Sequence, residues 1–144
     1  MRVFFDTSVL VPALVAKHPR HDGAASRLEL VHTGEIRLVI SAHTIAELYS
    51  TLTAIPLSPS ISPSAARELI SHNVLAEAEI VNLNAGDYEA VMARMAELGL
   101  SSGAIYDALH AYAARKSKVD RLWTSNERDF NRVWPDHDGV IEGV

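Results

Sequence analysis

Short apolar runs alternate with longer helical segments along this chain, and this alternation limits the possible folds more than any other feature of the sequence. Candidate strands lie at residues 2–5, 36–41, 78–83, 119–125 and 139–144. Candidate helices lie between them, at residues 7–16, 24–32, 42–55, 64–75, 85–98 and 101–118. Strands that alternate with helices form βαβ units. We therefore expect one α/β domain over residues 1–144, with a mostly parallel sheet covered on both faces.

Several helix ends carry local signals. Pro12 lacks a backbone N–H, so it either delays the start of the first helix or kinks it. Asn84 or Asp87 caps the fifth helix, and Gly99 ends it. A serine caps the helix that begins near residue 101, and the basic last turn of that helix suits the helix dipole.

Composition limits which kinds of site are possible. The chain has no cysteine, so disulfides and thiolate metal sites are excluded, and any metal must be held by oxygen or imidazole. The net charge of -5 does not favour nucleic-acid binding, although local basic groups can still contact phosphate. No stretch approaches the roughly 18 uninterrupted apolar residues of a membrane span. We therefore expect a soluble, cytoplasmic protein without a membrane partner.

The opening sequence MRVFFDTSVL places a carboxylate, Asp6, directly after an apolar strand candidate. Ligands of parallel α/β sheets bind beyond the carboxyl ends of the strands, and Asp6 follows one such end. A simpler interpretation is that Asp6 only caps the next helix. Taken alone, this stretch leaves both interpretations open.

Two further acids, Glu47 and Asp107, lie on predicted helices, each roughly opposite the apolar stripe of its helix. The ordinary interpretation is a solvated acid on an outer helical face. The alternative is a helix face open to a substrate or a metal, which small neighbours favour. Most helical neighbours of the two acids are small: Thr44, Ser50, Thr51, Ala54, Gly103, Ala104, Ala111 and Ala114.

The sequence LWTSNERDF places Thr124, Asn126 and Asp129 after the fourth candidate strand. They form either a polar turn, with Asn126 or Asp129 capping a short helix, or a further part of a site at this edge of the sheet. Carboxylates packed closely repel one another, and at neutral pH some must take up protons or share a cation. Hard oxygen ligands select Mg²⁺ or Mn²⁺, which can activate a water and orient a phosphodiester.

Four segments in a fixed order carry a family resemblance: FFDTSVLVPAL, AELYSTL, SGAIYDALHAYAA and LWTSNERDF. Together they resemble the PIN-domain ribonucleases, and most closely the VapC toxins of bacterial toxin–antitoxin pairs. The resemblance runs from the first strand to Phe130, which is nearly the whole chain. It implies a single PIN domain over residues 1–144, with a three-layer α/β/α fold and a mostly parallel five-stranded sheet.

The resemblance assigns roles to individual residues. It implies that Asp6, Glu47 and Asp107 are the acidic metal-binding triad of the family. Thr7 and Ser8 match the small polar pair that follows the first acid, where many relatives have asparagine in place of Ser8.

The match continues after the fourth strand. Thr124 and Asn126 correspond to a T-x-N or T-x-D step, and Asp129 with Phe130 corresponds to its D-F ending. The fourth acid of some relatives corresponds to the neutral Asn126. Either Asp129 compensates for it or three acids suffice, so the resemblance leaves one or two bound metals open.

The implied activity is Mg²⁺- or Mn²⁺-dependent hydrolysis of RNA phosphodiester bonds. The resemblance further implies a toxin of a type II toxin–antitoxin system, a homodimer, and a small VapB-type antitoxin that inserts a peptide into the active-site groove. Alternatives are a stand-alone RNA-processing nuclease and a catalytically silent module that binds RNA or protein. A phosphatase-like hydrolase is disfavoured, because Ser8 stands where such enzymes usually carry a second aspartate.

Histidines and basic residues supply further candidates. His43 and His110 lie four and three residues from Glu47 and Asp107, so each is either a partner of its acid or an ordinary surface or core histidine. Basic residues that could contact RNA phosphates form three groups: Lys17, His18, Arg20 and His21; Arg115, Lys116, Lys118 and Arg121; and Arg128 with Arg132.

Overall fold

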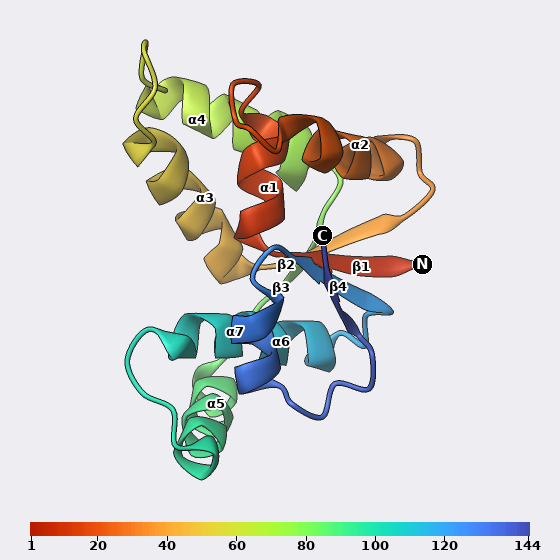
Figure 1. Ribbon diagram of the computed structural model, residues 1–144, viewed down its shortest axis with the longest axis vertical. Helices are drawn as coiled ribbons and strands as arrows, with labels where there is room; N and C mark the ends of the chain where they lie inside the picture. Colours follow the sequence, from red (N-terminus) through yellow and green to blue (C-terminus); the bar gives the residue numbers. More distant parts are fainter.

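Five short strands form the centre of the computed structural model, which describes residues 1–144 (Figure 1). They are β1 (Arg2–Phe5), β2 (Arg37–Ser41), β3 (Glu79–Val81), β4 (Arg121–Thr124) and β5 (Ile141–Gly143). All neighbouring strands pair in parallel, in the order β3-β2-β1-β4-β5. The sheet is therefore wholly parallel, which confirms the predicted α/β class.

Helices cover both faces of this sheet. Figure 1 shows α1 (Thr7–Leu14), α2 (His21–His32), α3 (Ala42–Ala54) and α4 (Pro63–Ile70) on one side. A π-helical turn, Ser71–Leu75, continues α4. The other side carries α5 (Ala85–Leu98), α6 (Ala104–Lys116) and α7 (Glu127–Val133). This is the three-layer α/β/α arrangement that the family resemblance implies.

The central strand β1 contributes to both hydrophobic cores, because successive side chains of a strand point to opposite faces. Val3 and Phe5 are fully buried in the core beneath α1 to α4. Phe4 is fully buried in the core beneath α5 to α7. A strand buried on both faces needs apolar residues at consecutive positions, which explains the run VFF.

Two helix starts differ from local predictions. α1 begins at Thr7, directly after Asp6, so the alternative in which Pro12 delays the helix is wrong; the proline lies inside the helix, which ends at Leu14. The predicted serine cap of α6 is also wrong. α6 begins after Gly103 and has no side-chain cap. Ser102 cannot provide one, because its φ of 58° is left-handed, whereas a capping residue is normally extended.

The predicted start of α5 is confirmed in both of its alternatives. The Asn84 side chain accepts a hydrogen bond from the backbone N–H of Asp87, and the Asp87 carboxylate accepts one from the N–H of Asn84. Gly99 ends the helix in the left-handed conformation, at a φ of 67°. The Asp87 carboxylate also accepts hydrogen bonds from Tyr112 and Lys116 of α6. Asp87 therefore joins α5 to α6.

We expect Asp87→Asn to lower the melting temperature at neutral pH. The hydrogen bond from Lys116, and then that from Asn84, hold the pKa of Asp87 below its ordinary value of 3.8. A lowered folded-state pKa stabilises the protein above the unfolded value and loses this effect as pH falls through the folded one. The gap between parent and variant should therefore close below about pH 4.

Thermal unfolding followed by circular dichroism across this pH range is the measurement. Glu89→Gln, at an exposed position of the same helix, is the matched control and should melt as the parent does at neutral pH. A gap for Asp87→Asn that stays constant into the acid range would contradict the link between α5 and α6.

Candidate active site

Asp6 lies where β1 ends, next to the end of β4. Its backbone N–H donates to the carbonyl of Trp123, so it continues the ladder between the two strands. Its side chain accepts hydrogen bonds from the hydroxyls of Ser8, at 2.6 Å, and Thr124, at 2.9 Å. The side chain makes no capping bond to α1. The interpretation of Asp6 as only a helix cap is therefore wrong, and the carboxylate is a buried group held by two hydroxyls.

The two hydroxyl groups that hold Asp6 are themselves fixed by backbone donors. The N–H of Ser125 donates to Ser8 Oγ at 3.0 Å, and the N–H of Asn126 donates to Thr124 Oγ1 at 2.9 Å. Each hydroxyl thus has an acceptor role toward the loop after β4 and a donor role toward Asp6. This explains why small hydroxyl residues occupy both positions.

Glu47, from α3, is a half-buried carboxylate with three side-chain donors. Thr7 Oγ1 donates to Oε2 at 2.8 Å. Both His110 Nε2, at 2.8 Å, and His43 Nε2, at 3.0 Å, face Oε1. Since a carboxylate only accepts, each of these imidazole nitrogens donates. Burial raises the pKa of Glu47, but the His110 and Thr7 hydrogen bonds outweigh it and hold the pKa below the ordinary value of 4.5.

His110, from α6, is both a core histidine and a partner of the site. The ring is only 1% exposed and packs beside Phe4. Its Nδ1 faces the hydroxyl of Ser41 at 2.9 Å, while Nε2 donates to Glu47. Ser41 in turn caps α3 by accepting from the N–H of Thr44. The histidine thus connects α6 to the start of α3. It is a core histidine, and its acid partner is Glu47 of α3 rather than the predicted Asp107 of its own helix.

Asp107 lies on the first turn of α6 and is half-buried. Burial and the nearby charge of Asp6 raise its pKa to about 6. The charges of Asp129 and Glu47 act in the same direction, while His110 acts against them. The carboxylates of Asp6, Glu47 and Asp129 are therefore close enough to Asp107 to repel its negative charge.

Asp129 and Asn126 differ in their relation to this cluster. Asp129 lies in the first turn of α7 and shares a hollow of about 300 Å³ with Asp107 and Arg132. Asn126 precedes α7 but its side chain does not cap the helix. Asn126 contacts the site through its backbone N–H, which donates a hydrogen bond to Thr124 Oγ1. The structure thus places Asp129 beside the other acids, and Asn126 supports them through its backbone.

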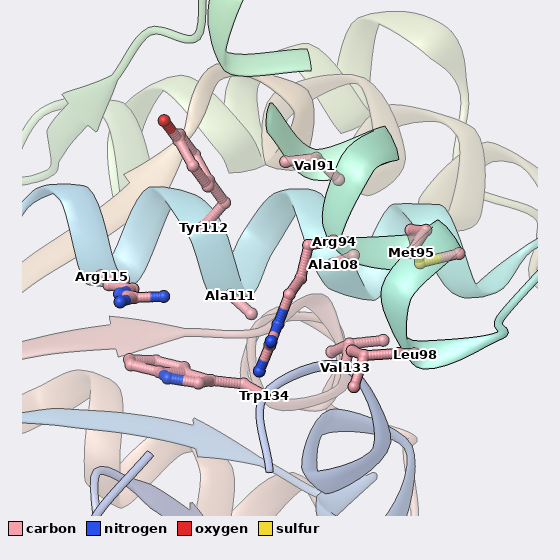
Figure 2. A pocket seen from close by; sticks show the side chains of 10 residues that line it. All are labelled: Val91, Arg94, Met95, Leu98, Ala108, Ala111, Tyr112, Arg115, Val133 and Trp134. Carbon is pink, nitrogen blue, oxygen red and sulfur yellow. The ribbon is translucent and has the colours of Figure 1, made fainter. Parts of the chain in front are cut away.

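Two hollows meet at Asp107. One holds Asp129 and Arg132, as described above. The other has a volume of about 480 Å³, and its lining includes Glu47, His43 and Tyr106. A third, smaller hollow of about 40 Å³ lies between α5, α6 and α7 (Figure 2). It is mostly apolar and contains none of the predicted acids, and Arg115 is the one residue of the predicted basic groups in its lining.

The donor chemistry of the cluster fits a hard divalent cation, since its carboxylate oxygens are what Mg²⁺ and Mn²⁺ prefer. Burial, and then the negative charge of Asp6, raise the pKa of Asp107, and a cation bound there would act against both. However, no three carboxylate or imidazole residues are grouped closely enough to hold one ion together. Both oxygens of Glu47 also already accept hydrogen bonds. Asp6 and Asp107 are therefore the acids that would hold a cation most directly.

Comparison with known proteins shows the family of this chain. The model of the PIN domain family matches residues 3–134. The chain belongs to the PIN domain family. Among its relatives are two proteins of Mycobacterium tuberculosis, named Ribonuclease VapC27 and Ribonuclease VapC40. The first is 31% identical over 115 residues, covering 80% of this chain and 78% of the relative. The second is 33% identical over 122 residues, covering 81% of each. The PIN domain here is thus of the VapC type.

Solved structures share the fold of this PIN domain. A Rickettsia felis VapBC2 complex bound to a promoter DNA fragment superposes with a TM-score of 0.69 at 23% identity, covering 99% of this chain and 98% of the other. VapC20 of Mycobacterium tuberculosis, described as a sarcin-ricin loop cleaving toxin, gives a TM-score of 0.63 at 17% identity, with 83% and 86% covered. No helix of the PIN domain is both long and apolar enough to cross a membrane.

Sequence reasoning did not identify two neighbours of the cluster. Ser41 was predicted only as the last residue of a strand, yet it holds His110. Tyr106 was not considered, although it precedes Asp107 and is 52% exposed.

We expect His110→Phe to destabilise the PIN domain by about 1–3 kcal/mol, because it leaves the buried side of Glu47 and the Ser41 hydroxyl without a partner while keeping the ring volume. His43→Phe should cost less, since the His43 side chain is 29% exposed and water can replace it. Urea denaturation of the two variants measures the difference. Equal stabilities for His110→Phe and the parent would show that the Glu47 network does not hold α6 to α3.

Proposed function

We propose that this PIN domain is a Mg²⁺- or Mn²⁺-dependent endoribonuclease, acting in the cytoplasm as the toxin of a type II toxin–antitoxin pair. One observation carries the proposal: four acids meet at one edge of a parallel sheet, namely Asp6, Glu47, Asp107 and Asp129. Their proximity contributes to the raised pKa of Asp107. The names of the VapC relatives support a ribonuclease activity. RNA is the proposed substrate.

The acids have separate proposed tasks. Asp6 and Asp107 would hold the cation, and Asp129 of α7, which lines the same hollow as Asp107, would add negative charge beside it. When bound, Mg²⁺ or Mn²⁺ lowers the pKa of a water and neutralises charge on the phosphate oxygens. Ser8 and Thr124 fix the Asp6 carboxylate by hydrogen bonds, so that it does not rotate away from the cleft. Glu47 contributes negative charge and fixes the position of His43.

An acidic protein needs local cations to hold RNA. Arg132 lines the hollow that also contains Asp107 and Asp129. On the opposite flank, Arg20 and Arg27 line a hollow of about 240 Å³ together with Ser8. These arginines lie on either side of the acids, where they can contact phosphates that flank the cleaved bond.

The first test is cleavage of a labelled structured RNA with Mg²⁺ or Mn²⁺. We expect Asp6→Asn and Asp107→Asn each to lower the cleavage rate about 100-fold or more, because a metal contributes several kcal/mol to transition-state stabilisation. EDTA should abolish cleavage by the parent. Asp22→Asn, at an exposed position of α2, is the control and should cut as the parent does.

Other results would favour the other functions. Metal-dependent cleavage without growth inhibition on expression would favour a stand-alone RNA-processing nuclease. RNA binding without any cleavage would favour a silent binding module. Cleavage that survives in both acid variants would show that the acids are structural.

The proposed partner is a small VapB-type antitoxin, supported by the VapBC complex among the structures with this fold. A groove of about 880 Å³ runs between α3 and α4, and its lining includes Ile45, Tyr49 and Ile70. Ala46 lines both this groove and the acidic hollow, so the two are adjacent. A peptide in the apolar groove could therefore reach the acids. The homodimer that the family resemblance implies stays a prediction.

We expect Tyr49→Ala to weaken binding of the VapB-type antitoxin about 10-fold or more, because exposed tyrosines in apolar grooves are typical binding hot spots. Tyr49 is 43% exposed in the free chain. Isothermal titration calorimetry with the antitoxin gives the affinity, and Tyr88→Ala, an exposed tyrosine on α5, serves as the matched control. Unchanged affinity for Tyr49→Ala would place the antitoxin outside this groove.

A further inference from the structure

Tyr106 presents an aromatic ring at the acidic cleft. It is 52% exposed and lies one residue before Asp107, in the first turn of α6. The hollow of about 480 Å³ that contains Glu47 and Asp107 is also lined by Tyr106 and His43. An exposed ring beside a cluster of acids adds nothing to either hydrophobic core, so packing does not explain its position.

The ring is held in place from α3. Tyr106 and His43 stack with their ring centroids 5.4 Å apart and their planes only 6° from parallel. His43 is fixed in turn, because its Nε2 donates to Glu47 at 3.0 Å. A ring whose orientation is already fixed loses little conformational freedom when a ligand stacks on it.

We propose that Tyr106 is a stacking platform for a nucleobase of the RNA beside the cleaved phosphodiester, an inference that rests on the proposed ribonuclease function. Unpaired bases of RNA are commonly recognised by stacking on aromatic side chains. Stacking on one ring tolerates any base, since every base has a π-face. Tyr106 thus positions the RNA relative to Asp107 without reading its sequence.

The location of the ring favours RNA over a protein partner as its ligand. Tyr106 and Asp107 are adjacent in sequence and line one hollow, so a base on the ring has its phosphate close to the acids. The exposed tyrosine of the groove between α3 and α4 is a different residue, Tyr49. The test below distinguishes RNA binding at Tyr106 from a protein contact there.

The test measures binding of short single-stranded oligoribonucleotides of mixed sequence by fluorescence anisotropy in Mg²⁺. Every variant is built on Asp6→Asn, so that bound RNA stays intact. The comparison covers Tyr106→Ala, Tyr106→Phe and the matched control Tyr88→Ala, whose tyrosine is 40% exposed on α5. A second set of oligonucleotides carries one abasic site, moved along the strand.

We expect Tyr106→Ala to raise the dissociation constant roughly 5- to 100-fold, as loss of one base–aromatic stack does. Tyr106→Phe and Tyr88→Ala should bind as the Asp6→Asn protein does, because stacking needs the ring but not its hydroxyl. Removing one particular base from the oligonucleotide should weaken its binding to the Asp6→Asn protein, which keeps Tyr106. The same removal should not weaken binding to the protein that also carries Tyr106→Ala. This non-additivity is the signature of a direct contact.

Three results would overturn the stacking role. In the first, Tyr106→Ala binds RNA with unchanged affinity. In the second, the affinity lost through Tyr106→Ala is the same for every abasic oligonucleotide, whichever base is missing. In the third, Tyr106→Ala changes only self-association or antitoxin binding. Failure of the proposed function is distinguishable, because cleavage by the parent chain tests it separately. A parent that cuts RNA with Tyr106→Ala unaffected overturns the platform alone, whereas a parent that neither cuts nor binds RNA overturns both.

Discussion

Parallel pairing of β1 with β2 on one side and β4 on the other is the constraint from which the site follows. Hydrogen bonds of a parallel ladder align the carboxyl ends of neighbouring strands at one edge. Asp6 continues the ladder by one bond, to the carbonyl of Trp123, and its side chain then meets Thr124. The elements that follow β1, β2 and β4 begin at this same edge, and each carries an acid.

Gathering these acids has an electrostatic cost, and the molecule meets it differently at each position. Glu47 is surrounded by donors from Thr7, His43 and His110, which keep it ionised. Asp107 has no comparable donors, so burial and the neighbouring charges raise its pKa to about 6. Asp107, where the two acidic hollows meet, is therefore the acid whose ionised form is least favoured. A bound divalent cation would favour that form.

Individual residues show how far the sequence could be interpreted. The run VFF predicted a short buried strand, and the structure buries it on both faces, which explains why its apolar residues are consecutive. Asp6 remained ambiguous, since a cap and a site residue can occupy the same position after a strand. The serine cap of α6 was predicted wrongly, because the left-handed backbone of Ser102 is not visible in the residue type. Pro12 is tolerated inside α1, because tertiary packing around this short buried helix outweighs the low helix propensity of proline.

The sequence alone determined the α/β class, the order of the elements and the family resemblance, because periodicity, turn residues and motif order are local properties of the chain. It also selected Asp6, Glu47 and Asp107 as candidates. Only the tertiary structure decided which groups contact these acids. Ser41 ends β2, whereas His110 and Tyr106 lie on α6, far from it in sequence. Their contacts with β2 and α3 depend on side-chain directions that helix packing sets. Local sequence patterns do not contain that information.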